Sequence, residues 1–181
     1  LIPVRGLVRD AALEERARCV GRLEFLQGER HQSEGNWKRA KLEYRRALEC
    51  QPGYTPAQIA LGVGMLEHEG NAKRAIMWLE RAVRGDPGSD TALSNLAAAY
   101  LRREEPGRAL ELLDRALEID PRRLDTLYNR ARALDDLGRE EAALRAWRDF
   151  VRMARGHPDR QEDLRFARKR IRKLSSDAGS P

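Results

Sequence analysis

The sequence has little of the material from which metal centres and disulfide scaffolds are made. Two of its 181 residues are cysteines and three are histidines, and aromatic residues make up 6%. Two cysteines cannot form a disulfide framework or supply four zinc ligands, and the histidines show no metal-ligand spacing. The scarcity of aromatic residues argues against a large β-sandwich or β-barrel. We therefore expect no metal and no cofactor.

Long hydrophobic runs are missing as well. The longest nearly uninterrupted apolar run covers residues 59–66, and two of its members are glycines. A transmembrane helix needs about 20 apolar residues, so we expect none, and no signal peptide is visible. The chain opens with Leu1 rather than Met, which leaves open whether it is a fragment or a processed form of a longer protein.

The residues that are abundant favour helices. Hydrophobic residues make up 41% and charged residues 35%, with a net charge of +6. The apolar share is too high for a disordered chain, and the dominance of Leu, Ala, Glu and Arg indicates a helical domain.

A repeat organises the chain. Three stretches end in similar phrases closed by Pro52, Pro87 and Pro121, which are 35 and 34 residues apart, and a fourth unit starts at Leu124. Equivalent positions form columns of small and bulky residues, which lets antiparallel helices approach closely. The columns are Ala40, Ala75, Ala109 and Ala143; Tyr44, Leu79, Leu113 and Trp147; and Ala47, Ala82, Ala116 and Phe150.

Glycines mark the end of the first helix in most units. Gly35, Gly70 and Gly138 supply a residue that tolerates the left-handed conformation. The third unit has Glu104 and Glu105 in this region, followed by Pro106, which can start the next helix.

These columns resemble the tetratricopeptide repeat, a 34-residue helix–turn–helix unit, over roughly residues 21–157. The resemblance implies an all-α fold, a right-handed α-solenoid of stacked helix–turn–helix repeats with a C-terminal capping helix. We expect four repeats within 10–157, at about 10–54, 55–88, 89–123 and 124–157. The expected helix pairs are 10–33 and 36–50, 56–69 and 72–84, 90–103 and 106–118, and 124–137 and 140–154. Around them we expect an irregular lead-in at 1–9, a basic capping helix at 158–174 and a disordered tail at 175–181.

No catalytic constellation or phosphate-binding loop is visible, so we expect no enzyme. The family implies a concave groove lined by the first helix of each pair, where a partner protein segment binds. The groove residues expected from this resemblance are Phe25, Glu29, Ala60, Gly64, Ser94, Asn95, Ala98, Arg102, Tyr128, Asn129 and Arg132. The small residues among them equally fit tight packing between repeats. Asn95 and Asn129 fit either pairing with a peptide backbone or hydrogen bonds between repeats.

The family's carboxylate clamp for acidic chaperone tails is matched here at Asn95 but not at the other four positions, Ala60, Gly64, Asp125 and Asn129. Such a tail is therefore not an expected partner. Residues 165–173 hold a basic run, with Arg165, Arg168, Lys169 and Arg172 as the candidate docking patch. This run fits docking to an acidic partner, nucleic acid or lipid, or a solvated outer face. The lack of accompanying aromatic residues disfavours nucleic acid.

Cys19 and Cys50 should be neighbours in the first helical hairpin, where they form either a disulfide or two free thiols. An oxidised pair would indicate a periplasmic location; otherwise cytoplasm and envelope stay open. The favoured function is a non-catalytic scaffold or adaptor that binds a partner segment in the groove and helps to assemble a multiprotein complex. The alternative is a basic module that docks nucleic acid or an acidic partner through its last helix. Self-association and a regulatory part of a larger enzyme remain open, as does the partner's identity.

Overall fold

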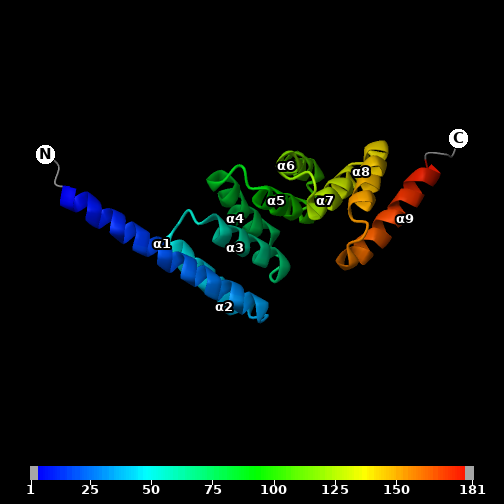
Figure 1. The fold of residues 1–181 in the computed structure, drawn as a ribbon. Helices are drawn as coiled ribbons and strands as arrows, with labels where there is room; N and C mark the ends of the chain where they lie inside the picture. Colours follow the sequence, from blue (N-terminus) through cyan, green and yellow to red (C-terminus); the bar gives the residue numbers. More distant parts are fainter. Residues whose placement is uncertain (1–3, 178–181) are drawn as a thin grey trace. The chain divides into compact units, whose positions relative to one another are not determined.

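The computed structural model describes the backbone of residues 4–177, and the side chains of residues 13, 15, 16, 18 and 20–176. Within this range the chain is α-helical, with one short 3₁₀ helix and no strand (Figure 1). It divides into two compact units, Leu1–Pro87 and Gly88–Pro181, which are described separately below. This is an all-α helical-repeat fold, as the repeat pattern predicts.

Unit 1 contains two helical hairpins. Helices α1 (Val4–Ser33) and α2 (Trp37–Cys50) form the first, and α3 (Thr55–Glu67) and α4 (Ala72–Gly85) form the second. Helix α2 also packs against α3, so the second helix of one repeat covers the first helix of the next. Tyr44 is buried in the shared core of these helices.

Unit 2 contains two more hairpins and a closing helix. Its elements are α5 (Asp90–Arg102), α6 (Pro106–Ile119), α7 (Leu124–Asp136), α8 (Glu140–Met153), a 3₁₀ helix η1 (Pro158–Arg160) and α9 (Gln161–Asp177). Each of these α-helices packs against the next one along the chain, so α9 lies against α8. In addition, α5 contacts α7. Leu164, Ala167 and Leu174 are buried on α9, so this helix covers the end of the last repeat.

The repeated columns form the core of both units. All members of the alanine column and of the bulky column four residues later are at most 1% exposed. The third column, from Ala47 to Phe150, is equally buried. The alternation of small and large side chains on one helix face therefore does what the sequence pattern predicts, which is to bring paired helices into close contact.

The helix ends follow the predicted glycine pattern, with one informative substitution. Gly35, Gly70 and Gly138 have φ values of 73°, 61° and 68°. In the third repeat, Glu104 adopts φ 60° although it carries a side chain. Left-handed backbone is unfavourable for a residue with a Cβ atom, so this turn keeps its shape at a conformational cost.

The first helix begins earlier, and the last helix ends later, than the sequence predicts. Helix α1 begins at Val4, so the predicted irregular lead-in at 1–9 is wrong from residue 4 onward. Pro3 allows a helix to start after it, and a single glycine, Gly6, costs only about 1 kcal/mol within a helix. Helix α9 ends at Asp177, three residues into the predicted tail, and Ser176 Oγ donates to Lys173 O. Residues 178–181 of that tail lie outside the described residues.

Two glycines, one in α1 and one in α3, allow close packing between helices that the repeated columns do not indicate. A Cβ atom on Gly28 would lie 2.5 Å from the Tyr44 ring, and one on Gly62 would lie 2.5 Å from Leu79 Cγ. Both distances are far below van der Waals contact. The bulky column therefore packs directly onto the backbone of α1 and α3.

Candidate partner-binding surfaces

Within unit 2, α5 and α7 are joined by buried polar contacts. The hydroxyl groups of Ser94 and Thr126 are 2.6 Å apart and buried. Arg123 donates to Asp90 Oδ2 at 2.5 Å and to Thr91 Oγ1 at 2.9 Å. Ser94 therefore joins two repeats and does not line an open surface. This outcome matches the packing alternative for that predicted groove residue.

The two asparagines of the predicted groove remain at the surface of these helices. Asn95 is half-buried and its Nδ2 donates to Thr91 O in its own helix, at 2.9 Å. Asn129 is also half-buried, and no described residue forms a hydrogen bond with its side chain. Neither carboxamide bonds to the neighbouring repeat. Asn95 Oδ1 and the whole Asn129 amide therefore keep hydrogen-bonding capacity.

Three more predicted groove residues lie on the same two helices. Ala98 is half-buried on α5, Arg102 is exposed in its last turn, and Arg132 is half-buried on α7. No described carboxylate forms an ion pair with Arg102 or Arg132. We call Asn95, Ala98, Arg102, Asn129 and Arg132 the α5–α7 face. It combines two amide groups, two guanidinium groups and one small side chain.

Tyr128 has a different environment from the one expected for an aromatic groove wall. Its ring centroid lies 5.3 Å from those of Trp147 and Phe150 and 6.2 Å from that of Phe166. Burial raises the pKa of its hydroxyl, with a further rise from Asp163 and an opposing effect of Arg132. Tyr128 is therefore part of an aromatic cluster that joins α7, α8 and α9.

In unit 1, the predicted groove residues of α1 contribute unequally. Phe25 packs against Tyr44, with ring centroids 5.5 Å apart, and edge-on against Tyr54 at 5.3 Å. It is half-buried, as is Ala60 on α3, and both pack on the hydrophobic core. Glu29 is exposed. Only Glu29 is thus presented fully to solvent in this part of the predicted groove.

Gly64 is closed to a partner by the chain itself. A Cβ atom at this position would lie 2.1 Å from the six-membered ring of Trp37. That indole stacks on His68, with ring centroids 5.2 Å apart, and its Nε1 donates to Glu69 Oε1 at 3.0 Å. Lys41 Nζ donates to the same oxygen at 2.6 Å. Gly64 permits close approach, as predicted, but the group that approaches is Trp37.

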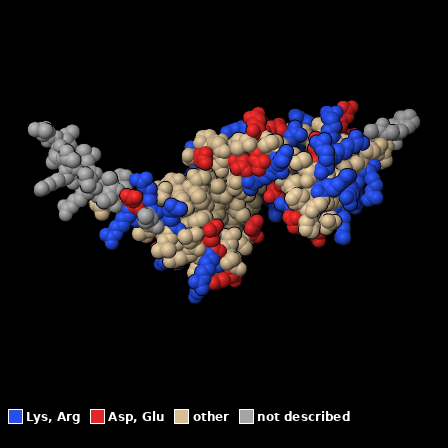
Figure 2. Space-filling view, viewed as in Figure 1, with Lys and Arg blue, Asp and Glu red and all other residues tan. Residues whose placement is uncertain are grey.

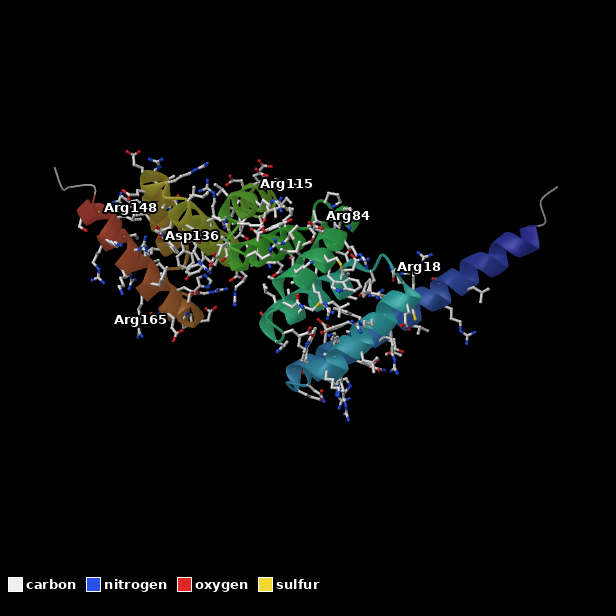
Figure 3. The ribbon with its side chains drawn as sticks, turned by 180° about the vertical axis from the view of Figure 1, so that it is seen from behind. Arg18, Arg84, Arg115, Asp136, Arg148 and Arg165 are labelled. Carbon is white, nitrogen blue, oxygen red and sulfur yellow. The ribbon has the colours of Figure 1, made fainter. Side chains whose placement is uncertain are left out.

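The basic run on α9 divides into one structural residue and a solvent-facing group. Arg170 Nε donates to Asp135 Oδ2 at 2.6 Å, which ties α9 to α7. We call the remaining five the basic face of α9: Arg165, Arg168, Lys169, Arg172 and Lys173. All five are exposed, and no described carboxylate forms an ion pair with them. Figure 2 shows this concentration of Lys and Arg over α9, and Figure 3 labels Arg165 on that helix.

A shallow hollow of about 440 Å³ on this helix is lined by Arg165, Arg168, Ile171 and Arg172. Three arginine side chains and one isoleucine line it, mostly with apolar atoms. A second hollow of about 440 Å³, in unit 1, was not predicted from the sequence. Its lining residues come from α2 and α4 and the link after α2: Arg45, Leu48, Glu49, Pro52, Trp78 and Arg81. The sequence feature that could have indicated this hollow is Trp78, a large aromatic residue next to Leu79 in the chain.

One of the two cysteines, Cys50, has a described side chain. The Cys50 side chain is half-buried. The side chain of Cys19 lies outside the described residues, so the disulfide stays a prediction. Among the described side chains, no cluster of histidine, cysteine and acidic residues has the makings of a metal site. No helix in the described part of the chain is both long and apolar enough to span a bilayer.

Two family models match the chain in overlapping segments. The one described as tetratricopeptide repeat matches residues 25–90. The one described as anaphase-promoting complex, cyclosome, subunit 3, matches residues 68–150. A serine/threonine-protein phosphatase T from Trypanosoma brucei brucei is 36% identical over 85 residues, which are 47% of this chain and 18% of that protein. The match thus spans less than a fifth of that relative.

Several solved structures share the fold. The MamA protein has a TM-score of 0.71 at 19% identity, with 87% of each chain covered. YrrB, described as a TPR protein with an unusual peptide-binding site, has a TM-score of 0.67 at 21% identity, covering 85% of this chain and 80% of its own. The first TPR of Spaghetti, bound to an HSP90 peptide, has a TM-score of 0.62 at 18% identity, covering 70% and 94%. At these identities the likeness shows the fold.

Proposed function

Because this chain belongs to the tetratricopeptide-repeat family, we propose that it is a non-catalytic scaffold or adaptor that binds a segment of a partner protein and helps to assemble a multiprotein complex. The binding surface in this proposal is the α5–α7 face. Two relatives in fold support the general role, since YrrB is described with a peptide-binding site and the Spaghetti repeat is bound to a peptide.

The observation that carries the proposal is the unused hydrogen-bonding capacity of Asn95 and Asn129. These residues occupy equivalent positions, 34 residues apart, on two helices that pack together. A carboxamide that donates and accepts can pair with both groups of a peptide unit in an extended segment. Arg102 and Arg132, on the same two helices, add positive charge. We therefore expect an extended partner segment with acidic side chains near one end.

The test is capture of partner proteins from cells that express this protein. The wild-type chain is compared with the variant Asn129→Ala/Arg132→Ala and with the control Arg115→Ala, which removes one exposed charge from α6. We expect the double variant to weaken binding of the captured partner by about tenfold or more, and the control to leave it unchanged. Thermal melting curves verify that all three fold equally well. Equal capture by the double variant and the wild type would refute this surface.

A second candidate function rests on the basic face of α9. Five exposed cations with which no described carboxylate forms an ion pair lie on this one helix, and three of them line a hollow. In this alternative the chain docks nucleic acid or an acidic partner through α9. Binding would then fall steeply with salt and be lost in the charge reversal Arg168→Glu/Arg172→Glu. Weak salt dependence together with sensitivity to Asn129→Ala favours the α5–α7 face.

A further inference from the structure

Helix α1 carries apolar side chains that are exposed to solvent. Leu13, Val20, Leu23 and Leu26 are 61%, 40%, 55% and 58% exposed. The residues that correspond to Leu23 in the later repeats are Ala57, Ala92 and Thr126, and each is 0% exposed. In α3 and α7 this face is covered because α2 and α6 pack on it. Along α1 the described part of the chain supplies no such cover.

The length of α1 matters for what can cover it. Its 30 residues extend about 45 Å, whereas α2 has 14 residues and its last residue, Cys50, lies against Gly21. Residues 4–20 thus project beyond α2, as Figure 1 shows. In the later repeats a proline-containing link precedes the first helix, but α1 runs without a break through the corresponding residues 17–20.

Three of these four exposed residues follow a spacing typical of a two-helix seam, and Leu26 lies outside it. Positions alternating by three and four residues along α1 define what we call the α1 stripe: Leu13, Arg16, Val20, Leu23, Gln27 and Arg30. Alternate steps of three and four keep these residues on one side of a helix that packs along another. The stripe is therefore shaped for a second, roughly parallel or antiparallel helix.

When two copies of the stripe pair in antiparallel orientation, each residue lies opposite one of compatible character. In an antiparallel pair of α1 helices, Val20 of one copy lies opposite Leu23 of the other, and Arg16 lies opposite Gln27. Both Val20–Leu23 contacts join apolar residues, and Arg16 can donate to the Gln27 amide oxygen. At the ends Leu13 lies under the aliphatic stem of Arg30, whose guanidinium is already bonded to Glu34 at 3.0 Å. A parallel pair would place Arg16 against its own copy.

We propose that the α1 stripe binds a second copy of this chain through an antiparallel α1–α1 contact. The occupant is a second copy because an identical helix supplies apolar, polar and charged groups in the right order without juxtaposing like charges. This contact uses none of the residues of the α5–α7 face.

The test is sedimentation velocity of the whole chain over a concentration series, with four proteins compared. The wild type is expected to show a monomer–dimer equilibrium, and Leu23→Asp, at an exposed position, is expected to be monomeric. Gln27→Arg places arginines opposite each other and should weaken the dimer by about tenfold or more. Adding Arg16→Glu to that variant creates opposite charges and should restore the dimer. Circular dichroism verifies helix content in each case.

Several outcomes would overturn the proposal. A wild-type chain that stays monomeric at every concentration contradicts it. A dimer that is insensitive to Leu23→Asp uses another surface. A dimer that Gln27→Arg weakens but the added Arg16→Glu does not restore has a different helix orientation. Binding of an unrelated protein in a Leu23-dependent manner by a monomeric chain would assign the stripe to that protein.

Discussion

The indole of Trp37 lies directly on the backbone of Gly64, in the space where any side chain at residue 64 would begin. This contact joins the second helix of the first repeat to the first helix of the second. It is held by the hydrogen bond from Trp37 to Glu69 and by stacking on His68. A position that looks like an opening for a partner is therefore an internal joint.

Replacing Gly64 with alanine should destabilise unit 1 in spite of the better helix propensity of alanine. The added Cβ would meet the Trp37 ring at 2.1 Å, and overpacking of this kind costs about 1–3 kcal/mol. In a Trp37→Leu background the clash is relieved, so the same substitution should be neutral or stabilising. A double-mutant cycle by urea unfolding measures this coupling. Equal effects of Gly64→Ala in both backgrounds would contradict the contact.

The left-handed turn at Glu104 predicts a stabilising substitution. Glu104→Gly should raise the free energy of unfolding by about 1 kcal/mol, because glycine adopts φ 60° without steric cost. The matched control is Gly138→Ala, which should lower it by a similar amount, since no atom lies within 4 Å of the added Cβ and only the backbone is strained. Thermal or denaturant unfolding measures both. A destabilised Glu104→Gly protein would show that the Glu104 side chain matters more than its backbone.

Helix α8 begins without a capping side chain, and this predicts a second stabilising change. Asn36 and Asn71 cap α2 and α4 by accepting hydrogen bonds from Arg39 N and Arg74 N. Arg139 stands at the equivalent place with similar backbone angles, φ −83° and ψ 66°, but its side chain forms no cap. Arg139→Asn should add about 0.5–1 kcal/mol to the free energy of unfolding, and Asn71→Ala should remove about 1 kcal/mol. No gain from Arg139→Asn would count against this assignment.

A pair of carboxyl groups between α1 and α2 predicts a pH dependence. A hydrogen bond with Glu43 raises the pKa of Glu24, burial and the charge of Glu43 add to this, and Arg46 opposes it. A folded-state pKa above the unfolded value of 4.5 means that this proton stabilises the fold at low pH. The stabilisation is then lost as the pH rises through the folded-state pKa.

The variant Glu24→Gln should therefore gain stability relative to the wild type as the pH rises from acidic to neutral. Urea unfolding of both proteins at several pH values measures the difference. Glu15→Gln, which removes an exposed carboxyl group elsewhere on α1, is the control variant. A difference that shrinks with rising pH would reverse the assigned sign.

The sequence predicted the repeat core because each column has one physical role in every repeat. Ala40 and Tyr44 recur as a small and a bulky residue one helical turn apart, and both classes are buried as expected. The third turn was recognised as lacking glycine, but only the structure shows that Glu104 itself adopts the left-handed conformation. The repeat pattern thus predicts the environment of a position that recurs in every repeat. It does not predict the backbone conformation of a residue that breaks the pattern.

The candidate surface was harder to predict because a small residue can serve either packing within the protein or binding of a partner. Gly64 and Ser94 are small for the sake of contacts within the protein, with Trp37 and Thr126 respectively. Nothing in the sequence distinguishes such contacts from an opening for a ligand. Asn129 has no hydrogen-bond partner among the described residues, and this depends on its three-dimensional neighbourhood. The projection of α1 was missed because Pro3 and Gly6 suggested irregular structure.

The central claim, that a partner segment lies on the α5–α7 face, is tested most directly by site-specific photo-crosslinking. A photoreactive amino acid replaces Arg102 on α5 or, as the control, Glu111 on α6; both positions are exposed. The measurement is the yield of crosslinked partner from the native complex, identified by mass spectrometry. The account predicts a crosslink from position 102 and none from position 111. A crosslink from position 111 alone would contradict it.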